Sequence, residues 1–215
     1  MVHDPPARRP SGTPRPEAGE PEKRRAILHA AVRVFAERGY HGCRIADVAR
    51  QAGVAYGLVY HYFRNKDQLL ASVCDEQWTI FIRALRAASE GPGSAGEQLA
   101  GVCRFAVDVF RTAPAAVRVL LLEVAPTPHA FRAGSTRQTF EEAVSIVAGM
   151  ISRGAARGEL RADADPTVAA TSLLGALELT LASMVTGIVR GGTEDEIEGV
   201  KRALVEQVVG GLLPR

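Results

Sequence analysis

Three observations predict an all-α protein with a small N-terminal head and a larger C-terminal helical domain. Apolar residues recur three or four positions apart along most of the chain, which is the spacing of one face of a helix. Helix start signals precede several of these segments, and no segment alternates convincingly like a strand. With 215 residues, 47% of them apolar, the chain is long enough for one or two units with a real core.

Residues 1–21 are expected to form a disordered tail. They are rich in Pro, Gly, Arg and Glu and contain no apolar run that could be buried. The same lack of an apolar run excludes a secretory signal.

The first helix of the head is expected to run from Glu22 to Arg38. Its apolar stripe consists of Ile27, Ala31, Val34 and Phe35. This stripe would pack over the two helices that follow and complete a three-helix head.

Residues 44–63 form two short helical segments that meet at a glycine-containing turn. The apolar residues of the first segment recur at helical spacing and are Ile45, Val48, Ala49 and Ala52. Gly53 is expected to end this helix, because glycine adopts positive φ without a steric penalty. The apolar residues of the second segment are Val54, Val59 and Phe63. Two helices joined in this way form a helix-turn-helix, which places its second helix in the major groove of DNA.

The outward side of the second segment carries Tyr56, Gly57, Tyr60 and His61. A half-buried aromatic cluster would explain an isolated tyrosine, but four such residues in this order favour a surface that contacts DNA. Glycine inside a helix costs about 1 kcal/mol relative to alanine. Close approach of a DNA backbone would justify that cost.

The next helix has its own start signal at Asn65. Asn65 is a favoured N-cap, and Gln68 three residues later completes a capping box. Asp67 suits the positive end of the helix dipole. The helix is expected to reach Ala87 and to connect the head to the rest of the chain. Lys66 stands beside exposed N–H groups, a position suited to holding a phosphate.

The stretch from about Glu22 to Val73 contains a specific pattern. It reads Phe35-Ala36-x-x-Gly39-Tyr40, Ile45-x-Asp47-Val48-Ala49-x-x-Ala52-Gly53-Val54 and Gly57-x-Val59-Tyr60-x-Tyr62-Phe63-x-Asn65-Lys66-x-x-Leu69. This pattern resembles the N-terminal domain of TetR-type transcriptional regulators. The family usually has Thr or Ser where this chain has Cys43-Arg44, at the start of the first motif helix. The cap there is expected from Gly42 or water, and Arg44 can instead face the phosphates.

The resemblance implies a transcriptional repressor that binds a palindromic operator as a dimer and is released by a small-molecule effector. The expected DNA contacts are Arg44, Ala55, Tyr56, Gly57, Leu58, Tyr60, His61 and Lys66. Leu58 would touch a thymine methyl, whereas the tyrosines and Lys66 would hold phosphates. Effector binding would favour a form in which the Asn65 helix pivots and spreads the two heads. The DNA-binding domain is expected at residues 22–68 and the ligand-binding and dimerisation domain at 69–215.

The charge distribution agrees with a DNA-binding head. Residues 1–70 carry 12 Lys and Arg against 7 Asp and Glu, a net charge of +5. Residues 71–215 carry 14 against 17, a net charge of −3. Phosphate binding needs such a positive segment. Two interpretations of Arg8, Arg9 and Arg15 stay open: a solvated tail, which we favour, or a basic arm in a neighbouring minor groove.

The C-terminal half is expected to be entirely helical. The predicted helices are Ala95–Thr112, Pro114–Val124, Thr136–Arg157, Pro166–Val189 and Glu194–Leu213. Helix starts are indicated by Ser94 with Glu97, by Asp165 before Pro166, and by Thr193 with Glu196. The sequence GPGSAG at Gly91–Gly96 fits a dinucleotide fingerprint but lacks its preceding strand. We interpret it as a turn between domains.

The predicted helix Pro166–Val189 has one charged residue, Glu178, and is apolar almost all round. Such a helix is buried on more than one side. A membrane span is the rival interpretation, but scattered Ser and Thr, the mid-helix Glu and the capped start disfavour it. We expect it to pack on its own domain and on a partner subunit. In the resembled family the last two helices form a four-helix bundle across a two-fold axis, which places two recognition helices about 34 Å apart.

The core between the C-terminal helices is expected to contain the effector pocket, since family members usually sense a small molecule there. The candidate lining residues are Trp78, Phe81, Phe105, Val109, Leu121, Met150, Leu177 and Leu181. Ordinary core packing is the alternative for each. His129 and Arg132, near the turn Ala125–Phe131, are candidates to meet an anionic head group, with a solvated loop as the alternative. The C-terminal half is similar to family members that respond to fatty acyl-coenzyme A.

Nothing in the sequence supports catalysis, a cofactor or a metal. Cys43, Cys74 and Cys103 are dispersed and lack metal-ligand spacing. Scattered thiols fit the reducing cytoplasm, where redox sensing through Cys74 or Cys103 stays an open alternative. No nucleophile elbow, P-loop or paired-carboxylate motif appears. The alternative to a regulator is a small-molecule binding protein whose head does not bind DNA.

Overall fold

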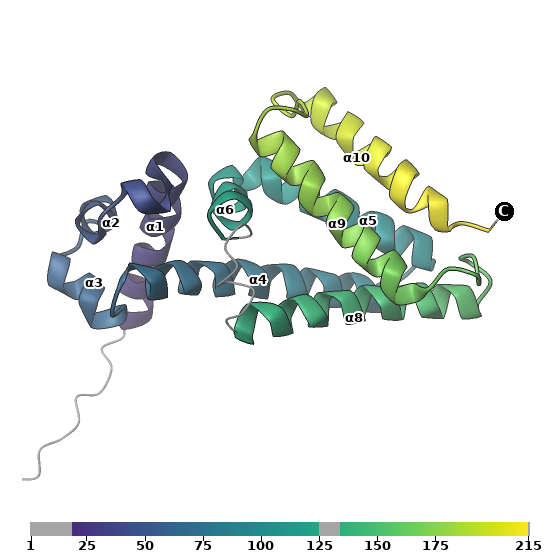
Figure 1. Cartoon of the computed structure of the whole chain (residues 1–215), viewed down its shortest axis with the longest axis horizontal. Coiled ribbons are helices and arrows are strands. Elements are labelled where there is room, and N and C mark those ends of the chain that lie inside the picture. Colours follow the sequence, from purple (N-terminus) through teal and green to yellow (C-terminus); the bar gives the residue numbers. More distant parts are fainter. Residues whose placement is uncertain (1–18, 125–133, 215) are drawn as a thin grey trace, which may run out of the picture.

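The computed structural model describes residues 19–124 and 134–214, and within these ranges it contains helices and no strand. The all-α prediction is confirmed. A small head is joined by one long helix, α4, to a larger helical domain (Figure 1). The helices are α1 (Glu20–Gly42), α2 (Ile45–Ala52), α3 (Tyr56–Tyr62), α4 (Lys66–Glu90), α5 (Ala95–Thr112), α6 (Pro114–Arg118), the π-helix η1 (Val119–Val124), α8 (Gly134–Ala156), α9 (Pro166–Val185), α10 (Glu194–Val208) and the 3₁₀ turn η2 (Gly210–Leu212).

The head consists of α1, α2, α3 and the first turns of α4 around a closely packed core. Ile27, Phe35, Val48, Val59 and Leu69 are fully buried in it. Its two glycine turns use positive φ, which glycine adopts at little cost. Gly39 (φ +71°) breaks the helical path of α1 where the sequence predicts its end, and Gly53 (φ +67°) ends α2 as predicted.

The start of α4 differs slightly from the predicted capping box. The Asn65 carboxamide oxygen accepts from the N–H of Gln68 at 2.8 Å, as expected. The Gln68 side chain, however, accepts from the N–H of Arg64 at 2.6 Å rather than from the N-cap residue itself. The helix start is therefore still closed by two reciprocal bonds.

The larger domain packs α5, α8, α9 and α10 against the distal part of α4 around a second core. The predicted caps form at Ser94, Asp165 and Thr193, each accepting from the N–H three residues later. α9 ends at Val185 rather than Val189, because Gly187 takes φ +77°. α10 ends at Val208 rather than Leu213, and two glycines follow it. The GPGSAG turn joins α4 to α5 within one domain, so its interpretation as an interdomain turn is wrong.

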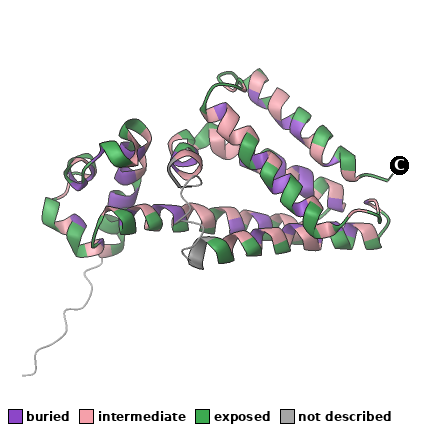
Figure 2. Cartoon of the chain, in the orientation of Figure 1, coloured by how far each residue is buried: buried purple, intermediate pink, exposed green. Residues whose placement is uncertain are grey.

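The outer face of α9 is apolar and uncovered in the single chain. α9 is long and apolar enough to cross a membrane by length and composition, yet it packs against α8, α5 and α10. Val168 is 64% exposed and Leu179 is 70% exposed, and the uncovered side of the helix is visible in Figure 2. A partner subunit would remove such a surface from water.

Candidate DNA-binding surface and ligand pocket

α3 presents two tyrosines to solvent at the outer end of the head. Tyr56 is 53% exposed and Tyr60 is 44% exposed, whereas Val59 between them is fully buried. Their rings meet edge to face at 5.1 Å, and the two hydroxyl groups are hydrogen-bonded to each other at 3.2 Å. This bond raises the pKa of Tyr60. The Tyr60 phenol therefore keeps its proton and can donate to a phosphate oxygen.

The other predicted DNA contacts on α3 lie around the tyrosine pair. Ala55 is the exposed N-cap residue, and His61 is exposed with its Nε2 3.9 Å from a Glu20 carboxylate oxygen. Leu58 is half-buried. A Cβ added at Gly57 would meet nothing within 4 Å. Gly57 is thus not required by packing within the head.

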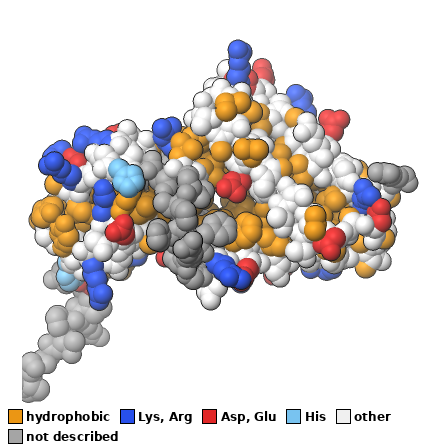
Figure 3. Space-filling model, viewed as in Figure 1, with side chains coloured by type: hydrophobic (Ala, Val, Ile, Leu, Met, Phe, Trp, Pro, Cys, Tyr) orange, Lys and Arg blue, Asp and Glu red, His pale blue; other side chains and the backbone are white. Residues whose placement is uncertain are grey.

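The start of α2 is closed by Asp47. The Asp47 carboxylate accepts the N–H of Arg44 at 2.9 Å, and Asp47 also pairs with Arg38 at 3.0 Å and Arg50 at 3.2 Å. The Arg44 bond, together with the two arginines, lowers the pKa of Asp47. Asp47 therefore supplies the closing contact that we expected from Gly42 or water. Arg44 and Arg50 remain exposed at the end of the head, where basic side chains are visible in Figure 3.

Lys66 lies differently from the sequence prediction. Its ammonium donates to the carbonyl oxygens of Tyr40 at 2.6 Å and Cys43 at 3.0 Å, and lies 4.3 Å from the centre of the Tyr40 ring. The Tyr40 hydroxyl in turn donates to Asp67. Sequence reasoning missed this role because the two carbonyls lie more than twenty residues away. Lys66 joins the end of α1 to the start of α4, and we do not retain it as a phosphate contact.

The larger domain contains a cavity of about 170 Å³ between α4, α5, α6, η1, α8 and α9. One water molecule needs only about 10–15 Å³ on a comparable measure, so the space suits a ligand. Seven of the eight candidate residues line it: Trp78, Phe81, Phe105, Val109, Leu121, Leu177 and Leu181. Met150 does not, because it is fully buried in the domain core.

Other lining residues were not anticipated from the sequence. They include Gln77, Phe140 and Glu178. Glu178 carried a signal, since it is the one charged residue in the predicted helix Pro166–Val189. The candidate head-group contacts His129 and Arg132 lie outside the described residues, as do Arg8, Arg9 and Arg15 of the tail.

The segment α6–η1 contacts the cavity and the head at the same time. Ala116, Val117, Leu120 and Leu121 line the cavity. Between them in the sequence, Arg118 Nε donates to the carbonyl oxygen of Ala36 in α1 at 3.1 Å, and Val119 is fully buried in the head core. Figure 1 shows α6 beside the head. A π-helix such as η1 is often found at functional positions.

All three cysteines are buried, and two of them have a raised pKa. Burial raises the pKa of Cys74 to about 12 and that of Cys103 to about 11. Thiols of this kind are poor redox sensors, because the thiolate is the reactive form. Within residues 19–124 and 134–214, no group of three His, Cys, Asp or Glu side chains could hold a metal ion.

Comparisons with known proteins agree with this geometry. The family model "Bacterial regulatory proteins, tetR family" matches residues 27–73, and "Tetracyclin repressor-like, C-terminal domain" matches residues 92–181. The chain is 27% identical over 186 residues to the fatty acid metabolism regulator protein of Bacillus subtilis, covering 86% of this chain and 93% of the relative.

Two solved structures are similar over nearly their whole length. The transcriptional regulator FadR from Bacillus subtilis in complex with stearoyl-CoA has a TM-score of 0.77 at 26% identity, covering 87% of this chain and 98% of that one. The fatty acid degradation regulator FadR from Bacillus halodurans has a TM-score of 0.79 at 23% identity, covering 90% and 97%, and shows the shared fold. From both family matches, this likeness and the helix-turn-helix, the chain belongs to the TetR family of bacterial transcriptional regulators.

Proposed function

We propose that this chain is a dimeric, effector-controlled repressor whose effector is an acyl-coenzyme A. The family supports a ligand-responsive DNA-binding regulator. The effector class is supported by the apolar lining of the cavity and by the similar FadR of Bacillus subtilis, which was solved with stearoyl-CoA. As a DNA-binding regulator, it would act in the cytoplasm.

The proposed DNA contacts are the exposed residues around α3. Tyr56 and Tyr60 would donate to phosphates, Arg44 would pair with the backbone, and the start of α3 would lie against base edges. The retained set is Arg44, Ala55, Tyr56, Gly57, Leu58, Tyr60 and His61. We assign residues 22–68 to the DNA-binding domain and residues 69–215 to the ligand-binding and dimerisation domain. Leu69 and Val73, at the start of the second domain, pack into the core of the head.

The two-fold assembly would form through α9 and α10. The uncovered apolar face of α9, with Val168 and Leu179, supplies the surface that a second copy would bury. α10 is held to the domain by Lys201, whose ammonium lies 2.6 Å from Asp108 on α5. A palindromic operator would then meet both recognition helices at once.

The observation that carries the regulatory proposal is the double contact of α6–η1. A ligand larger than the cavity would displace Val117 or Leu121 in its wall, and the same short segment holds α1 through Arg118 and the head core through Val119. The signal therefore has a second route besides the pivoting of α4. By linkage, operator DNA must weaken effector binding by the factor that effector weakens DNA binding.

The test combines two readouts of the purified protein. Operator affinity is measured by fluorescence anisotropy on the DNA upstream of its own gene, with acyl-coenzyme A series of increasing chain length. Occupancy of the cavity is measured from Trp78, the sole tryptophan of the chain. We expect some chain length to change Trp78 emission and to lower operator affinity about 5- to 150-fold. Binding to the cavity with no operator binding at all would instead support a ligand-binding protein.

The coupling route has its own variant. Arg118→Ala should leave the Trp78 response intact but reduce the effector-induced loss of DNA affinity several-fold. Arg104→Ala, at an exposed position on α5, is the matched control. Equal coupling in the two variants would refute the role of Arg118.

A further inference from the structure

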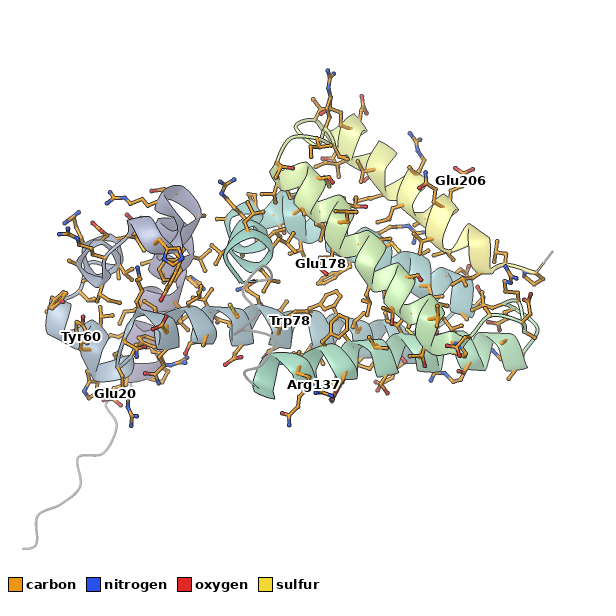
Figure 4. The ribbon with its side chains drawn as sticks, viewed as in Figure 1. Glu20, Tyr60, Trp78, Arg137, Glu178 and Glu206 are labelled. Carbon is orange, nitrogen blue, oxygen red and sulfur yellow. The ribbon has the colours of Figure 1, made fainter. Side chains whose placement is uncertain are left out.

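The start of α1 packs beside the end of α3. The Tyr62 hydroxyl donates to the backbone carbonyl oxygen of Glu20 at 3.2 Å, although the two residues are 42 positions apart in the sequence. The Glu20 carboxylate lies 3.9 Å from Nε2 of His61. Figure 4 shows Glu20 and Tyr60 at the same outer end of the head. The first turn of α1 therefore lies next to the helix that carries most of the proposed DNA contacts.

Two arginines meet at this junction. The Arg24 guanidinium lies 5.4 Å from the centre of the Phe63 ring, and the negative face of an aromatic ring holds a cation at such a distance. Phe63 is the residue that ends α3, and Arg64 follows it directly. Both arginines are exposed. Two positive side chains, one from α1 and one from the α3–α4 connection, therefore stand in solvent where α3 ends.

Neither of these arginines is neutralised by a carboxylate. Arg38 and Arg50, elsewhere on the head, both pair with Asp47. Within residues 19–124 and 134–214, by contrast, no carboxylate lies within ion-pair distance of Arg24 or Arg64. A guanidinium that is exposed and not paired with a carboxylate is well suited to bind a phosphate, which it can contact through two N–H groups at once.

The place of this junction at the end of α3 indicates which phosphates it would meet. The second helix of a helix-turn-helix lies in the major groove, and the two walls of that groove are the phosphate backbones. α3 has 7 residues and is therefore only about 10 Å long, at about 1.5 Å per residue. The groove is about 12 Å wide. Residues that follow the end of so short a helix lie close to a backbone wall.

We propose that Arg24 and Arg64 form a second phosphate-binding surface on the head, separate from Arg44 at the start of α2. Their guanidinium groups pair with the operator backbone where α3 ends. Glu20 opposes this contact, because its carboxylate repels a phosphate at the same junction. This role of α1 rests on the proposed function, since it requires α3 in the major groove.

The experiment measures DNA affinity of the full-length protein by fluorescence anisotropy over a range of salt concentrations. The probes are the DNA upstream of its own gene and a scrambled duplex. Each phosphate contact contributes about 0.9 to the slope of log affinity against log salt. Arg24→Met removes the charge but keeps an apolar stem over Phe63, so the slope should fall by about one unit per subunit on both duplexes. Arg64→Gln should lower it equally.

Arg33→Met is the matched control. Arg33 is exposed on the same helix, nine residues after Arg24 and therefore on the opposite face of α1, so its loss should leave the slope unchanged. Phosphate ethylation interference should lose one position in each half-site with Arg24→Met and keep it with Arg33→Met.

Glu20→Gln should act in the opposite direction. Removing this carboxylate should strengthen binding to both duplexes about two- to fivefold at low salt. The bond from Tyr62 is kept, because it goes to the Glu20 backbone. Glu90→Gln removes a carboxylate at the far end of α4 and should leave affinity unchanged.

Equal salt slopes for the wild type, Arg24→Met and Arg33→Met would overturn the proposal. An Arg24→Met variant that unfolds at a lower urea concentration but keeps its slope would also do so, since Arg24 would then only cover Phe63. Loss of affinity by Arg64→Gln for the operator alone would indicate a base contact instead. These results would leave the proposed function standing. Failure of the wild type to bind either duplex at low salt would refute that function and this contact together.

Discussion

The head and the larger helical domain, called the effector domain below, differ in where their proposed binding sites lie relative to the core. The head has a solid core, and its proposed DNA contacts stand outside it, with Tyr56 and Tyr60 exposed around the fully buried Val59. In the effector domain the proposed ligand site lies inside, where helices leave a cavity of about 170 Å³. Changes to the head core should therefore cost stability and DNA binding together, whereas changes at the cavity wall should alter ligand choice without unfolding the domain.

Phe63→Ala is expected to have the largest effect on both stability and DNA binding. Phe63 is 1% exposed in the head core, and removing a buried phenyl ring costs about 3–5 kcal/mol through lost burial and the cavity left behind. The head should lose its fold and its operator affinity at a lower urea concentration. Circular dichroism and anisotropy measure both quantities.

The matched control is Tyr56→Ala, which removes an exposed ring from the same region of the head. It should weaken operator binding while leaving the unfolding midpoint nearly unchanged, since substitutions on an exposed surface usually alter stability by less than about 0.5 kcal/mol. If Phe63→Ala also abolished the Trp78 response to ligand, the head and the effector domain would unfold together, and their stabilities could not be compared separately.

Lys66→Ala tests whether this residue holds the head together or holds DNA. Its ammonium satisfies two carbonyls, of Tyr40 and Cys43, and the loss of such charge-assisted bonds costs about 1.5–3 kcal/mol. Stability should fall by that amount in urea unfolding. The dependence of log affinity on log salt should keep its slope, because no phosphate contact is lost.

The opposite result would identify the role of Lys66 just as clearly. A slope reduced by about one unit with unchanged stability would restore Lys66 as a phosphate contact. A variant with methionine at this position, Lys66→Met, keeps most of the apolar stem and helps to separate lost packing from lost hydrogen bonds.

Gly57→Ala should have a smaller effect: it should raise thermal stability and lower operator affinity. An added Cβ meets nothing within 4 Å in the protein, and alanine favours a helix by about 1 kcal/mol over glycine. Thermal unfolding should therefore occur at a higher temperature. Operator affinity should fall if the DNA backbone approaches Gly57, and an unchanged affinity would remove Gly57 from the proposed contacts.

The head was largely predictable because its signals are local. Gly53 with positive φ, the Asn65 cap and the apolar spacing of Val59 and Phe63 each depend on residues within one or two helical turns. The same holds for the caps at Ser94 and Thr193 in the other domain. Local rules therefore placed the helices in both regions to within a few residues.

What sequence reasoning missed depends on contacts distant in the chain. Lys66 reaches carbonyls at the end of α1 and just after it, Arg118 reaches Ala36 across 82 positions, and Val119 completes the head core from the other domain. Met150 has the same character as the cavity-lining residues but is buried in the core. Periodicity identifies an apolar face but not which part of it remains unfilled.

The smallest expected effect on stability is that of Glu159, in the effector domain. Its carboxylate accepts the N–H of Ala95 at 2.6 Å, at the start of α5, and pairs with Arg157 at 2.7 Å. The bond from Arg157, followed by the Ala95 bond, lowers the pKa of Glu159 to about 2. Because this pKa is lower in the folded protein, the stability that Glu159 adds is complete above its ordinary pKa of about 4.3.

That contribution should disappear as the pH falls from about 4 towards 2, where the carboxylate takes up its proton. Glu159→Gln should therefore unfold the effector domain more easily at neutral pH and make its stability less dependent on pH in this window, as followed by Trp78 emission. Asp47→Asn is the corresponding variant in the head, since the pKa of Asp47 is also lowered. Losing the Asp47 carboxylate should not change how Trp78 emission depends on pH. If both variants altered that response equally, acid unfolding would be a single event, and α4 and α6–η1 would bind the two regions into one cooperative unit.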